Sequence, residues 1–136
     1  KIPNGGPFIE DRLSIMYSEG VAKGRITINE FVDMISTSAA KIFGLFPQKG
    51  TIAVGSDADI VVFDPQAKRT ISAETHHMNV DYNPFEGWEV TGEPVSVMVR
   101  GEFVVKDKEF VGTLGSGKYL KRKSKAMQIL ESATMA

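Results

Sequence analysis

Apolar residues near the start of the chain are spaced as in an amphipathic helix. Leu13, Met16 and Tyr17 lie three and four positions apart, which places them on one helical face. Glu10 and Asp11 precede them, where carboxylates interact favourably with the amino end of a helix dipole. The pattern predicts a helix that follows the preceding Gly-Pro pair and is ended by Gly20 and Gly24.

Two further helices are expected downstream. Residues 27–30 read Thr-Ile-Asn-Glu, a capping box in which the threonine and glutamate side chains bond each other's backbone amides. The second helix therefore begins there, and Phe31 lies on its apolar face. A separate third helix is expected from residue 36 or 37 to Gly44. The side chains that it is expected to bury are Ala39, Ile42 and Phe43.

The hydrophobic pattern changes to that of β-strands in the second half of the chain. Residues 59–65 are a β-branched run closed by proline, which predicts a strand buried on both faces, with 68–71 as its neighbour. Residues 95–99 alternate between valine and other side chains, as in a half-buried strand. Turns at 100–102 and 106–108 then predict an antiparallel meander. One β core is expected from Ile60, Val62, Val97, Val99, Phe103 and Val105.

Composition excludes several classes of protein. A chain of 136 residues suits one domain but is too short for a complete (β/α)8 barrel of about 250 residues. Its 16 basic and 17 acidic residues argue against a nucleic-acid-binding protein, and the absence of cysteine excludes a thiolate zinc site. The apolar run 60–63 is far below the roughly 18 residues of a membrane span. We therefore expect a cytoplasmic protein without nucleic-acid or membrane partners.

The first residues, 1–7, contain several glycines and prolines and no initiator methionine. They lack the apolar core of a signal peptide. We interpret them as a loop from within a longer protein.

Candidate chemistry is sparse when residues are considered alone. Adjacent histidines such as His76 and His77 point in different directions in a strand or a helix, so loop histidines with hydrogen bonds are favoured over a metal site. Asp57 and Asp59 precede an apolar strand, where turn or capping roles are favoured over paired catalytic acids. The Gly-Ser-Gly at 115–117 lacks the strand and helix that flank a phosphate loop and is interpreted as a linker.

The last part of the chain, residues 113–136, is basic. It has five lysine or arginine residues and one glutamate, a net charge of +4. We expect this tail, with a possible helix at 124–133, to be a docking arm rather than part of the core.

Several segments together resemble the carboxy-terminal part of amidohydrolase-superfamily proteins. Residues 39–45 and 49–64 carry the superfamily pattern. A narrower similarity, to the D-hydantoinase and dihydropyrimidinase branch and especially to bacterial hydantoinases, extends through nearly the whole chain and fades after about Arg122. The segments that carry it are 2–7 (Ile-Pro-Asn-Gly-Gly-Pro), 9–12 (Ile-Glu-Asp-Arg), 75–77 (Thr-His-His) and 83–88 (Asn-Pro-Phe-Glu-Gly-Trp).

This resemblance implies an α+β fragment of a larger enzyme. Residues 1–44 would be the last loop and helices of a metal-dependent (β/α)8 barrel, 45–112 part of an antiparallel β-sandwich, and 113–136 a carboxy-terminal arm. The whole enzyme would open hydantoins or dihydropyrimidines to N-carbamoyl amino acids through a hydroxide held by two divalent metals, usually zinc. The family's metal ligands and catalytic aspartate match no residue of this chain, so we expect the chain alone to be inactive and metal-free.

One substrate-binding residue is implied by the resemblance. The Ile-Pro-Asn-Gly loop of the family holds the substrate amide through the main chain of its asparagine, which is Asn4 here. A cyclic amide presents an N–H beside a C=O, which complements a backbone C=O and N–H. Considered alone, Asn4 and Gly5 form a common turn dipeptide.

The implied partners are a small cyclic amide, the missing amino-terminal part of the protein, and further copies in a homodimer or homotetramer. Leu13, Met16 and Tyr17 would lack their covering layer without the barrel. Two alternatives stay open: a non-catalytic, dihydropyrimidinase-related assembly protein, and a free-standing β-rich binding module.

Overall fold

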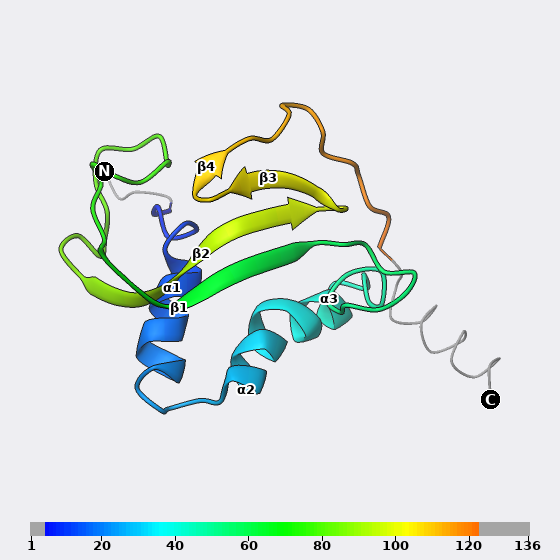
Figure 1. The fold of residues 1–136 in the computed structure, drawn as a ribbon, viewed down its shortest axis with the longest axis horizontal. Helices are drawn as coiled ribbons and strands as arrows, with labels where there is room; N and C mark the ends of the chain where they lie inside the picture. The colour runs from blue at the N-terminus through cyan, green and yellow to red at the C-terminus, as the bar shows by residue number, and fades with distance from the viewer. Residues whose placement is uncertain (1–4, 123–136) are drawn as a thin grey trace. The chain divides into compact units, whose positions relative to one another are not determined.

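A computed structural model describes residues 5–122 of the chain, which form helices followed by a four-stranded sheet (Figure 1). No helix in this described part is long and apolar enough to span a membrane. The elements are α1 (Arg12–Met16), η1 (Tyr17–Val21), α2 (Ile28–Val32), η2 (Asp33–Thr37), α3 (Ser38–Ile42), β1 (Ile60–Thr70), β2 (Glu89–Val99), β3 (Glu102–Lys106) and β4 (Glu109–Phe110).

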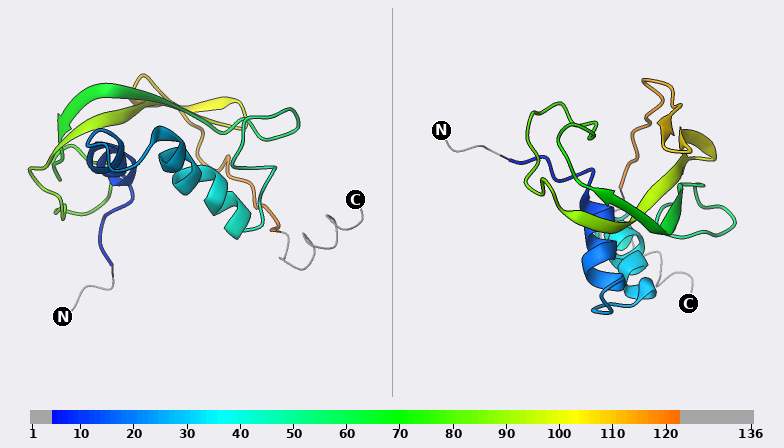
Figure 2. Two further views of the ribbon diagram at one scale, coloured as in Figure 1. Left: turned by 90° about the horizontal axis from the view of Figure 1, so that it is seen from below. Right: turned by 60° about the vertical axis from the view of Figure 1, so that its left-hand side comes forward.

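The chain divides into two compact units. Unit 1 comprises Lys1–Phe31 and Val62–Val95, and unit 2 comprises Val32–Val61 and Ser96–Ala136. In unit 1 the helix formed by α1 and η1 lies against β1 and β2 (Figures 1 and 2). The expected tail helix at 124–133 lies outside the described residues.

The first helix is confirmed, and its apolar face packs against β1 and against the second helix. The ring of Tyr17 lies 4.9 Å from that of Phe63 on β1 and 5.8 Å from that of Phe31. Leu13 and Met16 are half-buried. The helix ends at Val21, between the two glycines expected to end it, Gly20 and Gly24.

The capping box at the second helix is also confirmed. The Thr27 hydroxyl accepts a hydrogen bond from the Glu30 amide at 3.2 Å, and the Glu30 carboxylate accepts one from the Thr27 amide at 2.7 Å. The pKa of Glu30 is lowered, first by this backbone hydrogen bond and then by one from the Thr27 hydroxyl. The reciprocal pair satisfies two amide groups that the first helical turn leaves free.

The prediction of a separate third helix was wrong. α2, η2 and α3 form one continuous helix (Figure 2). In its α3 part the buried residue is Ala40, while Ile42 and Phe43 are 77% and 59% exposed. The following loop explains the choice of face. The Thr37 hydroxyl donates to the carbonyl of Gly50 at 2.7 Å, and a Cβ on Gly50 would lie 2.5 Å from that of Ala40. Glycine therefore lets the loop pack closely on this side of the helix.

The first strand is longer and less buried than expected. β1 continues through Pro65 to Thr70, so residues 68–71 are not a neighbouring strand, and Val61 and Val62 are each 48% exposed. The strand order β1-β2-β3-β4 places β1 at a sheet edge. An edge strand tolerates proline because its outward N–H groups have no ladder partner.

The antiparallel meander is confirmed for β2, β3 and β4. Arg100 and Gly101 between β2 and β3 have φ of 54° and 83°, and Asp107 and Lys108 between β3 and β4 have φ of 51° and 71°. Positive φ at both central residues is the signature of the turns that match the twist of a two-residue hairpin.

The prediction of the β core residues was wrong. None of its six residues is buried, and the buried apolar side chains of the described part are Phe31, Ala40, Ile71 and Val90. Among residues 95–99 of β2 the buried position is Ser96 instead of the valines beside it. The Ser96 hydroxyl accepts a hydrogen bond from the Asp107 amide at 3.1 Å, so this position carries a turn contact rather than apolar packing.

Candidate functional site

The residues that follow Asn4 lead into the first helix within a few positions. Asn4 itself lies outside the described residues, whereas Gly5 to Asp11 are described. The Phe8 amide donates to the Gly6 carbonyl at 3.0 Å. A Cβ on Gly6 would lie 2.5 Å from the Phe8 ring, so glycine permits this tight turn. We call residues 2–7 the Asn4 loop.

A buried carboxylate anchors the end of this stretch. Asp11 occupies the N-cap position of α1 but caps no helix amide, and it is fully buried. Its Oδ1 accepts a hydrogen bond from Arg69 Nη2 at 2.7 Å, and its Oδ2 accepts one from Asn83 Nδ2 at 2.7 Å. The expectation that Asp11 serves the helix dipole therefore misses its main partners, which come from β1 and from the loop before β2.

Arg69 and Asn83 are themselves held in place. Arg69 Nε lies 3.8 Å from the carboxylate of Glu93 on β2. The Asn83 side chain is buried, and its Oδ1 accepts a hydrogen bond from the Phe85 amide at 2.9 Å. Both polar atoms of the Asn83 amide are thus used, and so are both oxygens of Asp11. A buried polar network satisfied in this way has one preferred arrangement.

Glu10 forms a second link beside the first. One of its carboxylate oxygens accepts a hydrogen bond from the His77 amide at 2.7 Å, and the other lies 2.8 Å from His77 Nδ1. His76 Nε2 lies 2.9 Å from the carbonyl oxygen of Val80. The interpretation of both histidines as loop residues with hydrogen bonds is confirmed.

An aromatic contact forms the third link. The Phe8 ring meets that of Phe85 edge-on at 5.9 Å, and Phe85 meets Trp88 at 5.2 Å. The Glu86 carboxylate accepts a hydrogen bond from the Ala73 amide at 2.7 Å. The pKa of Glu86 is lowered, first by this bond and then by one from Ser72. We call residues 72–88, which provide these contacts, the clamp segment.

Residues 5–7 and the clamp segment also line a small, open cavity. Its volume is about 300 Å³, and its lining is mostly glycine and apolar side chains. A cavity of this size would admit a small organic group. The lining residues are Gly5, Gly6, Pro7, Met78, Val80 and Tyr82.

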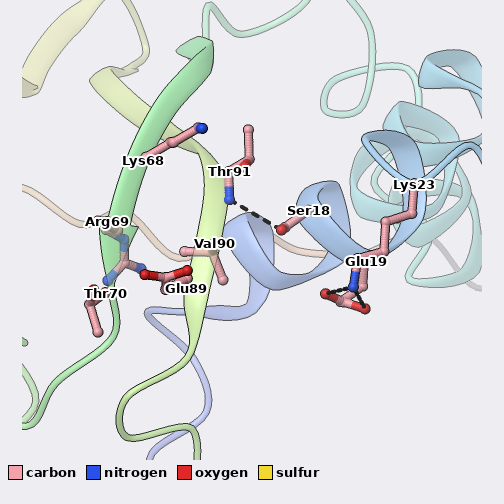
Figure 3. Close-up of a pocket in the computed structure, with 9 residues that line it drawn as sticks. All are labelled: Ser18, Glu19, Lys23, Lys68, Arg69, Thr70, Glu89, Val90 and Thr91. Carbon is pink, nitrogen blue, oxygen red and sulfur yellow. Dashed lines mark hydrogen bonds and ion pairs between the residues drawn. The ribbon is translucent and has the colours of Figure 1, made fainter.

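A larger cavity of about 590 Å³ lies between the first helix and the ends of β1 and β2 that belong to unit 1 (Figure 3). The Ser18 hydroxyl accepts a hydrogen bond from the Thr91 amide at 3.1 Å, and Lys23 pairs with Glu19 at 2.7 Å. The charges on its wall are of both signs and largely paired, which does not suggest a catalytic constellation. The lining residues are Ser18, Glu19, Lys23, Lys68, Arg69, Thr70, Glu89, Val90 and Thr91.

The aspartates before β1 have a structural role. In unit 2 the Lys49 ammonium pairs with Asp57 at 3.0 Å and with Asp59, and Asp59 also accepts a hydrogen bond from the Arg100 amide at 2.8 Å. Burial lowers the pKa of Lys49, but the hydrogen bonds to both aspartates outweigh it, so the pKa is raised. The hydrogen bond from Lys49 lowers the pKa of Asp57. These carboxylates brace a loop and a hairpin rather than form an acid pair.

The described residues contain no group of three or more histidine, aspartate or glutamate side chains placed to hold a metal ion. Reasoning from single residues missed the network around Asp11. The only signal for it was that segments 9–12, 75–77 and 83–88 all carried the family resemblance, and the structure brings these three segments together.

The model of the amidohydrolase family matches residues 7–104. The chain belongs to the amidohydrolase family. Among curated relatives of this amidohydrolase chain, the D-hydantoinase of Geobacillus stearothermophilus is 74% identical over 122 residues, which cover 90% of this chain and 26% of the relative. The dihydropyrimidinase of Rattus norvegicus is 52% identical over 90% of this chain and 24% of its own length.

Solved structures agree with this assignment. The D-hydantoinase from Bacillus sp. AR9 has a TM-score of 0.89 and 73% identity, covering 91% of this chain and 27% of that one. The L-hydantoinase of Arthrobacter aurescens has a TM-score of 0.77 at 39% identity, covering 81% of this chain and 24% of that one. The resemblance to the hydantoinase and dihydropyrimidinase branch is thereby confirmed. The chain spans about a quarter of the length of the relatives it matches.

Proposed function

We propose that this chain is the substrate-loop part of a metal-dependent hydrolase that opens cyclic amides such as hydantoins and dihydropyrimidines. The observation that carries the proposal is the 74% identity to a D-hydantoinase over 90% of the chain. The relatives' names supply the substrate class. Three links between residues 8–11 and the clamp segment support the proposal, because they fix the residues that follow this loop.

In this proposal the main chain of Asn4 binds the amide edge of the ring. A backbone N–H and C=O match the adjacent C=O and N–H of a cyclic amide without the entropy loss of a flexible side chain. The next residue, Gly5, lines the small cavity beside the clamp segment.

The metals belong to other parts of the proposed enzyme. Amidohydrolases are generally metal-dependent, but the described residues supply no ligand set. We propose that two zinc ions are held by residues in the part of the enzyme that lies outside this chain. The contribution of this chain is then to bind and orient the substrate.

Exposed apolar side chains support a covered position for the helix of α2, η2 and α3. Ile28, Val32 and Ile42 are 51%, 47% and 77% exposed and lie near one side of the helix, at spacings of four and ten residues. Such a stripe usually marks an interface. We propose that residues 1–44 end a barrel, that 45–112 join a sandwich, and that 113–136 form an arm in a cytoplasmic homo-oligomer, a dimer or tetramer.

The test is an assay of the complete enzyme that contains this chain. We expect it to convert hydantoin and dihydrouracil to N-carbamoyl products, identified by mass spectrometry, and to lose activity after chelation and regain it with zinc. A folded, zinc-loaded protein that opens neither ring would contradict the proposal and would favour a non-catalytic assembly protein.

A further inference from the structure

We propose that His77 is an acyl-acceptor site, at which the exposed ring nitrogen Nε2 takes an acyl group from a small activated donor of the anhydride type. Glu10 is then a positioning residue that holds the imidazole for this reaction. This reactivity is separate from the proposed ring-opening function and does not depend on it. The side chains that carry it, Glu10, His76 and His77, all lie in unit 1.

The carboxylate of Glu10 fixes both the orientation and the tautomer of the His77 ring. One of its oxygens accepts a hydrogen bond from the His77 amide at 2.7 Å, and the other lies 2.8 Å from Nδ1. Because an ionised carboxylate only accepts hydrogen bonds, Nδ1 carries the ring proton, and Nε2 of the neutral ring keeps its lone pair. Catalytic and metal-ligating histidines are oriented by a carboxylate in the same way.

The lone pair of Nε2 is open to reagents in solution. The His77 side chain is 83% exposed, whereas that of Glu10 is 29% exposed. Asp11, the next residue after Glu10, is fully buried and accepts hydrogen bonds from Arg69 and Asn83. The carboxylate that orients the ring is therefore attached to a firmly held backbone, while the nitrogen that would react is accessible.

His76 provides the contrast, because the same side chain one position earlier has no accessible nucleophilic nitrogen. Its Nε2 lies 2.9 Å from the carbonyl oxygen of Val80, and since a carbonyl only accepts, Nε2 is the protonated nitrogen. The lone pair then lies on Nδ1, which is buried and has no hydrogen-bond partner among the described residues. The two histidines of this chain are thus expected to differ in reactivity although they are adjacent.

The acyl transfer forms one bond to nitrogen and breaks one bond in the donor. The Nε2 lone pair attacks the acyl carbon, and the leaving group departs as an oxyanion with the electron pair of the broken C–O bond. Nδ1 gives up its proton to the Glu10 carboxylate, which passes it to water, and the product is a neutral N-acyl imidazole. Before the proton leaves, the negative charge of Glu10 stabilises the positive charge that develops on the ring.

The experiment treats the complete enzyme that contains this chain with a limiting amount of diethyl pyrocarbonate, an anhydride-type donor. Tandem mass spectrometry of the peptide that holds both histidines separates modification at the two positions, and this readout needs no ring-opening activity. We expect His77 to react at least about tenfold faster than His76, because modification of a buried nitrogen requires the clamp segment to open first. Equal rates, faster reaction of His76, or an unmodified His77 would overturn the proposal.

Glu10→Gln tests the contribution of the carboxylate. The amide keeps one acceptor for Nδ1 but has no negative charge, so the rate at His77 should fall about fivefold, the scale of charge interactions between exposed groups. The rates are compared at about pH 8 and about pH 9, where histidine side chains are largely neutral, so that a difference reflects nucleophilicity and not the degree of protonation.

Glu19→Gln is the matched control. It also removes one carboxylate from unit 1, but Glu19 pairs with Lys23 and has no contact with the clamp segment. The rate at His77 should stay within about twofold of that of the unchanged enzyme. Equal rates at His77 in Glu10→Gln and in Glu19→Gln would overturn the positioning role of Glu10.

Discussion

Replacing Asp11 with alanine is expected to lower the free energy of unfolding by about 3 kcal/mol. The substitution leaves Arg69 and Asn83 without the acceptor that each meets at 2.7 Å, and removing one partner of a buried ion pair costs roughly 3–5 kcal/mol. The lower end applies because the Arg69 side chain is 27% exposed and can recover some hydration. Urea unfolding followed by circular dichroism gives the value.

Glu19→Ala is the control for this prediction. Glu19 pairs with Lys23 at 2.7 Å on an exposed face of the same helix, and such surface pairs contribute about 0–1 kcal/mol. Similar losses in the two variants, or a loss below about 1 kcal/mol for Asp11→Ala, would show that the buried network does not carry the helix–strand contact.

Gly92→Ala should destabilise the chain by about 3 kcal/mol, the second large effect. Gly92 has a φ of 90°, which other residues adopt with strain. A Cβ there would lie 2.4 Å from the Tyr17 ring and 2.8 Å from the Phe63 ring, and overpacking of this kind costs about 1–3 kcal/mol in addition. The absence of a side chain on β2 is what lets these two rings meet.

Gly87→Ala separates the two contributions. Gly87 has a φ of 79°, but no described atom lies within 4 Å of a Cβ placed there. It should therefore show only the backbone strain, about 1–2 kcal/mol. If thermal melts of Gly87→Ala and Gly92→Ala coincide, the ring contact at Gly92 is not as close as the structure indicates.

Local sequence signals predicted local structure well. The capping box at 27–30 and the turns at 100–102 and 106–108 depend on residues within four positions of each other, and the structure has all three. The predictions of where the second helix ends and how long β1 is were wrong, because contacts with residues distant in the sequence decide both. Gly50 packs on Ala40, and the edge position of β1 removes the penalty that proline would carry in a central strand.

The candidate site was predictable only in part for the same reason. The family resemblance pointed to Asn4 and to the segments around Asp11, His77 and Asn83, but residue types alone did not. Asp11 meets partners that lie 58 and 72 positions away. Because hydrophobic periodicity reports on one element at a time, it contains no information about such pairs. The position of Asp11 before the helix favours a helix-dipole role, but its buried side chain binds partners on other elements instead.

The most direct test of the proposed hydrolase function is to exchange this chain into a known enzyme. The 122 matching residues of the Geobacillus stearothermophilus D-hydantoinase would be replaced by those of this chain, and kcat/KM for hydantoin would be measured after zinc loading. We expect a value within about tenfold of that of the parent enzyme, equivalent to a change of about 1.4 kcal/mol in transition-state stabilisation. A folded, zinc-loaded exchange enzyme that binds and opens no hydantoin would contradict it.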